Sequence, residues 1–143
     1  MSMPPNQYFE GILQLRNESQ ALIDAVARHI EKKENVNIAK IANVPNGVDI
    51  YISSQRFLRP LGQKLQAQFG GVLKATNRLF SRNHLTSREV YRVNVLLRLP
   101  NFKKGDTIRF KGEEVEVIGM QKKVLIKNKT TGKKQSVRFE DVM

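Results

Sequence analysis

The sequence contains no cysteine among its 143 residues and only two histidines. Without cysteine the chain has no disulfide framework, no thiol nucleophile and no zinc site with thiolate ligands. Thirteen carboxylates and two imidazoles also offer few ligands for other metals, so we expect no metal and no other cofactor. No apolar run is long enough to cross a bilayer, and the first residues lack an apolar secretory segment. We therefore expect a cytoplasmic protein that does not bind a membrane.

Acidic residues are scarce, and their scarcity is uneven along the chain. Lys and Arg number 25 against 13 Asp and Glu, which gives a formal net charge of +12. Residues 1–55 are almost neutral, with five basic and six acidic side chains, whereas residues 56–98 carry nine basic and one acidic, and residues 99–143 carry eleven and six. A surplus of positive charge attracts polyanions. The segment 56–98 is therefore the first candidate for nucleic-acid binding.

The first part of the chain alternates between apolar and polar residues and then changes to a helical period. Apolar side chains recur at every second position in residues 9–15, which is typical of a half-buried strand and places Phe9 on its core side. Asn17 stands where a helix cap is expected, and the apolar period that follows predicts an amphipathic helix to about residue 33. His29 falls opposite the apolar stripe of this helix, which is typical of a solvated histidine.

Four further strands are predicted in two pairs. Residues 36–44 and 48–52 are rich in β-forming residues and flank Pro45-Asn46-Gly47, where the Asn-Gly pair tolerates the positive φ of a tight hairpin turn. Residues 72–80 and 89–99 form the second pair, and we expect a polar, basic loop between them.

A second helix is predicted between the two pairs of strands. Ser53 or Ser54 can cap its start, and Gly70 and Gly71 follow its end. Pro60 lacks the N–H that a helix interior requires, so we expect it to kink this helix or to reset its start. The apolar stripe of the helix consists of Phe57, Leu58, Leu61, Leu65 and Phe69.

The predicted order of elements over residues 8–99 is β-α-β-β-α-β-β. This order suits an antiparallel or mixed sheet with both helices on one side, which is a two-layer α/β sandwich of the α+β class. One face of the last strand, with Val93, Val95 and Leu97, is predicted to belong to the core. A domain of roughly ninety residues is large enough to bury a core of its own.

Residues 101–143 are predicted to form a second, all-β domain. They show no helical period, and short β-rich runs alternate with turn segments such as Lys111-Gly112 and Thr131-Gly132-Lys133. Five short strands in about forty residues suit a small SH3-like barrel, because a closed barrel leaves no exposed edge. An OB-like (oligonucleotide-binding) barrel is the alternative.

No catalytic motif is evident in the sequence. It has no Gly-rich phosphate loop, no His-Glu-x-x-His, no Gly-x-Ser-x-Gly and no acidic cluster spaced for two metals. Glu10 and Asp49 lie on strands that can be neighbours, but carboxylates are common on the solvent face of a strand, so a paired acid-base role is the weaker interpretation. We expect no enzyme activity and no small-molecule substrate.

Basic residues are the candidates for function. Arginine predominates among the cations of residues 56–98, and its planar guanidinium suits phosphate groups and base stacking. The residues predicted to bind RNA are Arg56 and Arg59 on the second helix; Lys74, Arg78, Arg92 and Arg98 on the polar face of the last two strands; Arg82, His84 and Arg88 in the loop 81–88; and Lys122, Lys123, Lys129, Lys133 and Lys134 at turns of the second domain.

Three hypotheses about function follow from these residues. The first is binding of structured RNA through its backbone and shape, because no helix-turn-helix or basic zipper for reading a DNA sequence is evident. The second is a protein-interaction module whose SH3-like barrel binds a peptide or protein partner at an edge or in a groove. The third is a metal-dependent nuclease, which requires Glu10, Asp49 and Glu89 to converge.

Three segments carry a resemblance to a known family: residues 8–16 (YFEGILQLR), 47–53 (GVDIYIS) and 91–100 (YRVNVLLRLP), the last followed by Lys104-Gly105-Asp106. Together they resemble the nonsense-mediated mRNA decay protein three family, the export adaptors of the large ribosomal subunit. The resemblance implies a non-enzymatic assembly factor that binds ribosomal RNA and proteins on the intersubunit face of that subunit. It also implies an α/β domain similar to a ribosomal protein, followed by small β-barrels.

Members of that family carry an N-terminal zinc-binding region with paired cysteine motifs, and eukaryotic members carry an acidic, leucine-rich export tail. This sequence contains neither, so the resemblance implies a central to C-terminal piece of an archaeal-type member. We expect a monomeric, cytoplasmic module of a large-subunit biogenesis factor, with basic surfaces that bind ribosomal RNA and ribosomal proteins.

Overall fold

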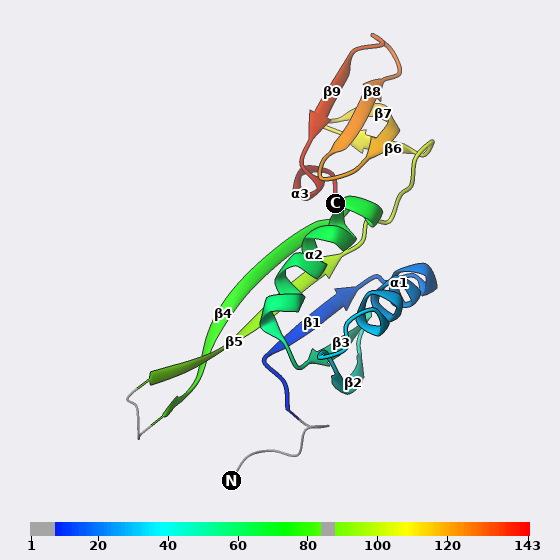
Figure 1. Cartoon of the computed structure of the whole chain (residues 1–143). Helices are drawn as coiled ribbons and strands as arrows, with labels where there is room; N and C mark the ends of the chain where they lie inside the picture. Colours follow the sequence, from blue (N-terminus) through cyan, green and yellow to red (C-terminus); the bar gives the residue numbers. More distant parts are fainter. Residues whose placement is uncertain (1–7, 84–87) are drawn as a thin grey trace.

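Two β-sheets, each with its own hydrophobic cluster, make up the protein (Figure 1). The computed structural model describes residues 8–83 and 88–143, and among these it describes the side chains outside residues 78–91. The first sheet has five strands in the order β2-β3-β1-β5-β4, and the second has four in the order β6-β7-β8-β9. We refer to residues 8–99 as the five-stranded unit and to residues 101–143 as the four-stranded unit.

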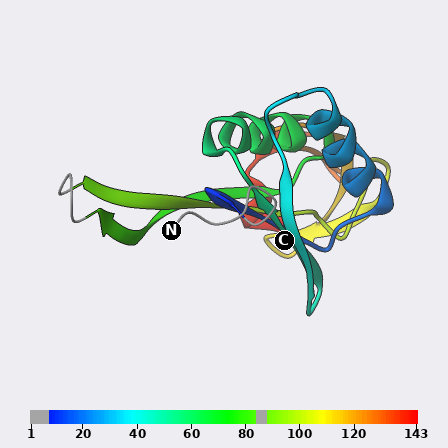
Figure 2. The same ribbon diagram turned by 60° about the horizontal axis from the view of Figure 1, so that its bottom comes forward.

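The five-stranded unit has the predicted α+β order of elements. In chain order these are β1 (Gly11–Arg16), α1 (Gln20–Glu31), β2 (Ile38–Val44), β3 (Gly47–Ile52), α2 (Gln55–Phe69), β4 (Val72–Asn83) and β5 (Arg88–Arg98). The sheet is mixed, because β1 and β5 are parallel neighbours while its other pairs are antiparallel. Both helices cover one side of the sheet, as predicted, and the other side is open (Figure 2).

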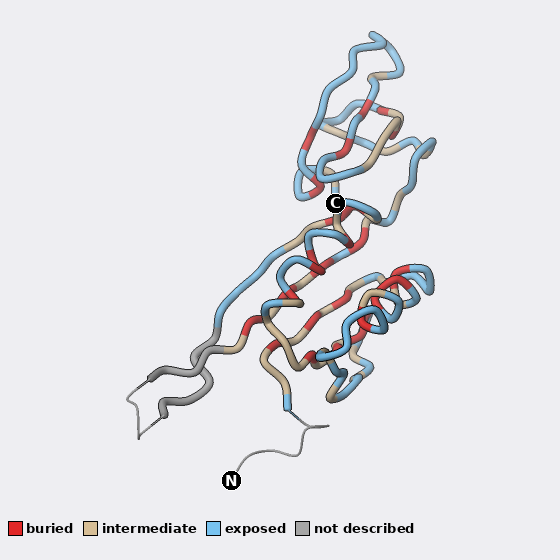
Figure 3. The backbone as a smooth tube through the Cα atoms, in the orientation of Figure 1, coloured by how far each residue is buried: buried red, intermediate tan, exposed pale blue. Residues whose placement is uncertain are grey.

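The core of this unit lies between the helices and the sheet. Buried positions recur at every second residue along the central strands and at helical spacing along α1 and α2 (Figure 3). Each fully buried large apolar side chain stabilises the fold by roughly 1.5–3 kcal/mol relative to exposure. The central core residues are Leu13, Leu15, Leu22, Val26, Ile50, Ile52, Leu58, Leu61, Leu65, Val93, Val95 and Leu97.

The start of α1 differs from the prediction. Ser19, not Asn17, caps the helix, and its Oγ accepts a hydrogen bond from a backbone N–H of the first turn at 3.2 Å. Asn17 instead adopts a left-handed conformation with φ 56°. Its side-chain amide donates to oxygen atoms of Leu99, Pro100 and Asn101 at 3.0 to 3.3 Å. The predicted cap was wrong because a tertiary contact to the link between the units uses this side chain.

The start of α2 agrees with the prediction. Ser54, one of the two candidate caps, accepts a hydrogen bond from the backbone N–H of Phe57. Glu10 adds a second cap, because its Oε1 accepts from the N–H of Gln55 at 2.9 Å and a carboxylate is favourable at a helix N-terminus. The helix runs through Pro60, so this proline does not reset its start. Within the described ranges, no helix is both long and apolar enough to cross a membrane.

Strands β4 and β5 are longer than predicted. Residues 81–83 and Arg88 were expected in a loop, but they continue the antiparallel pairing as far as Asn83 and Arg88. Since β1 pairs with β5 only from Val93 onward, the rest of this hairpin extends beyond the sheet (Figures 1 and 2). Such an extension is not packed between layers, so residues 81–89 carry no regular apolar alternation to mark it.

The four-stranded unit is an antiparallel sheet. Its elements are β6 (Thr107–Phe110), β7 (Glu113–Met120), β8 (Val124–Asn128), β9 (Lys134–Val137) and the short helix α3 (Phe139–Val142). Four of the five predicted strands are present in this described stretch, and a helical turn follows the last of them. In the strand order, β6 and β9 stand at opposite edges. Closure into an SH3-like or OB-like barrel stays a prediction.

The two units are in contact at the end of α2. Gly70 ends the helix with φ 77°, and the Phe139 ring lies so close that a Cβ on Gly70 would stand 2.7 Å from it. Val72, at the start of β4, packs against the hydrophobic cluster of the four-stranded unit. Together with the hydrogen bonds of Asn17, these contacts join the units across the short link at residues 99–101.

Candidate nucleic-acid interface

The side of the five-stranded sheet opposite α1 and α2 forms the candidate interface, and we call it the open face. Side chains that alternate with the buried core residues lie on it, and the strand register sets which of them are neighbours. Its main members are Lys40 on β2; Asp49 and Tyr51 on β3; Ile12, Gln14 and Arg16 on β1; Arg92, Asn94, Leu96 and Arg98 on β5; and Lys74 and Thr76 on β4.

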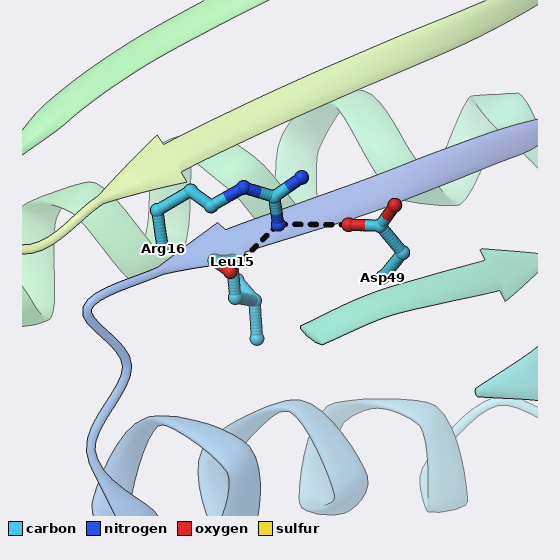
Figure 4. A network of polar contacts seen from close by, with 3 residues as sticks. All are labelled: Leu15, Arg16 and Asp49. Carbon is cyan, nitrogen blue, oxygen red and sulfur yellow. Dashed lines mark hydrogen bonds and ion pairs between the residues drawn. The ribbon is translucent and has the colours of Figure 1, made fainter. Parts of the chain in front are cut away.

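Positive charge predominates on the open face. Among the described side chains of the face, Asp49 is the one carboxylate, and its Oδ1 accepts a hydrogen bond from Arg16 Nη1 at 2.8 Å (Figure 4). The same nitrogen donates to the carbonyl oxygen of Leu15 at 2.9 Å. The two side chains are only 22% and 14% exposed, so the pair is held in the sheet surface. Among the described side chains of the face, the charge offered to a ligand therefore comes mainly from Lys40, Lys74 and Arg98.

A row of cations and aromatic rings crosses the sheet at the end of the open face near the N-terminus of β1. The Phe9 and Tyr51 rings meet edge to face, with centroids 4.9 Å apart and an angle of 83°. The Arg92 guanidinium lies 3.7 Å from the Phe9 centroid, and Lys40 Nζ lies 5.5 Å from that of Tyr51. Partial burial is the main cause that lowers the pKa of Arg92, although arginine stays charged in proteins. The stack orients the guanidinium before any ligand arrives.

The position of Phe9 contradicts the prediction that it lies on the core side of the first strand. The regular strand begins only at Gly11, and the chain bends at Glu10. The Glu10 carboxylate turns to the start of α2, while Phe9 contacts Tyr51 and Arg92 on the open face. Extrapolating the alternation past the bend assigned Phe9 to the wrong side.

The other end of the open face leads into a hollow beside the four-stranded unit. The hollow has a volume of about 990 Å³, and Arg16 and Arg98 line it together with Met143 from the other unit. Four amide side chains, which can donate and accept hydrogen bonds, also line it: Asn17, Asn43, Asn46 and Asn101. Arg98 therefore extends the open face to the junction of the two units, where Glu18 is the one acidic side chain that lines the hollow.

The predicted RNA-binding residues separate into several places. Lys74, Arg92 and Arg98 lie together on the open face, as the alternation predicted. Arg56 and Arg59 are exposed on α2, which covers the opposite side of the sheet, and Arg59 donates a hydrogen bond to Asn77 there. The helix and strand cations were predicted without a relative orientation, and the structure divides them between two sides.

The hairpin extension contains three more of the predicted residues. By backbone pairing, Arg78 is opposite Arg92, Arg82 is opposite Glu89, and Arg88 is opposite Asn83. The side chains of Arg78, Arg82 and Arg88 lie outside the described part, and His84 lies outside the described residues altogether.

The predicted lysines of the four-stranded unit lie at opposite ends of its sheet. The exposed Lys122 and Lys123 occupy the turn between β7 and β8, where a hollow also includes Ala67 of α2. Lys129 and Lys133 occupy the turn between β8 and β9, and Lys134 begins β9. Only the first pair is next to the five-stranded unit.

Sequence reasoning missed several residues of the open face. Phe9, Arg16, Lys40 and Tyr51 were not selected as binding residues. Tyr51 stands between the buried Ile50 and Ile52, so strict alternation could have found it. The pairing of Lys40 with Tyr51 depends on a register shift in β2, which the sequence pattern does not reveal.

The carboxylates are engaged in structural contacts. Glu10 caps α2 and accepts a hydrogen bond from the Tyr8 hydroxyl at 2.6 Å, which is the main cause that raises the pKa of Tyr8. Asp49 is bound to Arg16. Among the described residues no group of three or more His, Cys, Asp or Glu could hold a metal. Glu10 and Asp49 are therefore each engaged in another contact, and the side chain of Glu89, the third residue of the nuclease hypothesis, lies outside the described part.

Comparison with known proteins adds a family to this geometry. A family model described as NMD3, second domain, matches residues 8–99, which are the whole five-stranded unit. A search among curated proteins found no match. Because the matched region covers more than half of the chain and coincides with a complete sheet and its helices, the chain belongs to the NMD3 family.

Proposed function

We propose that this chain is a non-enzymatic, RNA- and ribosome-binding module of a large-ribosomal-subunit biogenesis factor, and that its open face binds ribosomal RNA. Membership of the NMD3 family supports the ribosomal context. The observation that carries RNA binding is the charge of the open face: five basic residues, Arg16, Lys40, Lys74, Arg92 and Arg98, stand against the one carboxylate among its described side chains, Asp49.

The chemistry of the open face fits an RNA backbone. Lys74 and Arg98 are exposed and can reach phosphate groups, which dominate the affinity of most nucleic-acid complexes. Thr76 and Asn94 are directly opposite each other on β4 and β5 and offer neutral donors and acceptors to sugars and bases. Arg92 is already stacked on Phe9, so less side-chain entropy is lost when it binds.

The four-stranded unit takes part in the proposal as a second contact. We propose that it is an SH3-like barrel, since an irregularity between Val117 and Gly119 interrupts the pairing of β7 and Phe139 fills its hydrophobic cluster. The hollow at the junction would then place RNA against both units. Peptide binding by this unit is the alternative, in which an edge strand, β6 or β9, would pair with a partner.

Co-sedimentation with large ribosomal subunits at several salt concentrations tests the proposal. We expect the double variant Lys74→Glu and Arg98→Glu to lose roughly tenfold or more in affinity at about 100 mM salt, without a change in melting temperature. The matched control is Arg28→Glu with Lys32→Glu, which changes the net charge equally at exposed positions of α1 and its C-terminal cap, on the other side of the sheet, and should lose much less. Binding that is absent at low salt, insensitive to salt, or equally weakened in both variants would contradict the proposal.

A further inference from the structure

The helix-covered side of the five-stranded unit contains a groove that the open face does not involve. The groove lies between α1 and α2 and has a volume of about 390 Å³, within the usual range of ligand sites. Its floor is apolar and consists of Val36, Phe57, Pro60 and Leu61. Leu61 is buried, Val36 and Phe57 are half-buried against the core, and Pro60 is exposed. The floor therefore offers apolar surface to a ligand between the two helices.

The rim of the groove is basic. Lys33, Arg56, Lys64 and His29 line it, and none of its lining residues is acidic. His29 was expected on the solvated side of α1, but it is half-buried beside α2. Burial is the main cause that lowers its pKa, and Lys64, Lys32 and Arg28 lower it further. The rim of the groove is positively charged because Lys33, Arg56 and Lys64 line it and no lining residue is acidic.

We propose that this groove is a docking site for an acidic, amphipathic helical segment of a partner protein. Apolar side chains of that segment would occupy the floor, and its carboxylates would pair with Lys33, Arg56 and Lys64. Binding of a helix in an apolar groove is a common mode of peptide recognition, with anchors at helical spacing. Charge complementarity selects an acidic partner over a neutral or basic one, because bringing like charges together is unfavourable.

The composition of the groove favours a protein over RNA. Nucleic-acid recognition uses charged, amide and exposed aromatic groups, whereas this floor is aliphatic apart from the half-buried Phe57. The groove and the open face lie on opposite sides of the sheet, so occupation of one leaves the other accessible (Figure 2). The inference therefore does not depend on RNA binding by the open face.

A phage-displayed library of acidic peptides three to four helical turns long, with randomised apolar positions, tests the proposal on the full chain. We expect enrichment of peptides that place apolar residues at i, i+3 or i+4, and i+7 between Asp and Glu. The double variant Arg56→Glu and Lys64→Glu should weaken a selected peptide roughly tenfold or more. The control variant Lys74→Glu with Lys122→Glu, of equal charge change outside the groove, should bind it like the unmodified chain.

Two outcomes would overturn the inference. One is that no acidic amphipathic peptide is enriched, or that the enriched peptides bind the groove variant and the control equally. The other is that the groove variant loses affinity for large ribosomal subunits as strongly as Lys74→Glu with Arg98→Glu, which would assign the groove to RNA. Because the library contains no RNA, failure of this inference and failure of RNA binding by the open face are distinguishable.

Discussion

Asp49 is the residue whose replacement separates stability from RNA binding most clearly. It is the one carboxylate among the described side chains of the open face, and it holds Arg16 at 2.8 Å. Asp49→Asn retains an oxygen that can accept the hydrogen bond but removes the charge. The variant should fold less stably and bind RNA more tightly, because the positive charge of Arg16 is then no longer neutralised and adds to the attraction for phosphate groups.

The structure sets the expected size of both effects. A hydrogen bond to a charged group contributes about 1.5–3 kcal/mol to the free energy of unfolding. Because the amide of Asn can keep the bond and both side chains are partly exposed, we expect Asp49→Asn to lower the free energy of unfolding by about 1 kcal/mol. For binding, each phosphate contact adds about 0.7–0.9 to the slope of log K against log salt. One extra contact that contributes nothing at 1 M salt would therefore raise the affinity about sixfold at 0.1 M.

Fluorescence anisotropy with a structured ribosomal RNA fragment between about 50 and 200 mM salt measures the slope, and thermal denaturation measures the stability. Asp141→Asn is the control, because it removes the negative charge from the exposed Arg138–Asp141 pair of the four-stranded unit, with the same change in net charge. The control should leave slope and melting temperature unchanged. If Asp49→Asn weakens binding, or if both variants strengthen it equally, Arg16 and the open face do not act as we infer.

Three further predictions concern the fold. Gly47→Ala should lower the free energy of unfolding by about 3 kcal/mol or more in chemical denaturation, because the added Cβ would stand 2.1 Å from the carbonyl oxygen of Leu15. The control Gly105→Ala adds a Cβ with no atom within 4 Å, and its φ of 97° should cost only about 1–2 kcal/mol. Asn17→Ala should increase proteolysis in the link between the units, since three hydrogen bonds to it are lost, and unchanged proteolysis would show that the link is fixed by other contacts. NMR titration of His29 should give a pKa below its ordinary value of 6.5, so that near this pH the folded state binds fewer protons than the unfolded state. The free energy of unfolding should therefore decrease as the pH falls through 6.5 and should level off below the folded-state pKa. His29→Gln should remove this dependence on pH.

Local patterns were sufficient to predict most elements of the five-stranded unit. Alternation identified the core side of β5, where Val93, Val95 and Leu97 are buried, and it placed Arg92 and Arg98 on the other side. These predictions succeed because a strand that packs on a helical layer must present every second side chain to it. The cap at Ser54 was predictable for an equally local reason.

Features that depend on distant contacts were not predictable from local patterns. Asn17 has the chemistry of a cap, but its partners lie more than eighty residues later in the chain. Arg59 and Lys74 belong to the same basic segment, yet they lie on opposite sides of the sheet because α2 and β4 are different layers. Charge counted along a sequence therefore identifies a candidate segment but does not define a surface.

The parallel pairing of β1 with β5 has a consequence for how the chain folds. Gly11 pairs with Val93 and Leu15 with Leu97, so the first strand meets one of its two neighbours only after almost the whole unit has left the ribosome that makes it. Contacts so distant in sequence slow folding, because the chain between β1 and β5 must lose conformational entropy before the contacts that stabilise the pair can form. Until then one edge of β1 and the apolar residues beside it remain uncovered. A truncation before Arg88 would remove the strand that joins β1 to β4, and the remaining strands could not form one sheet.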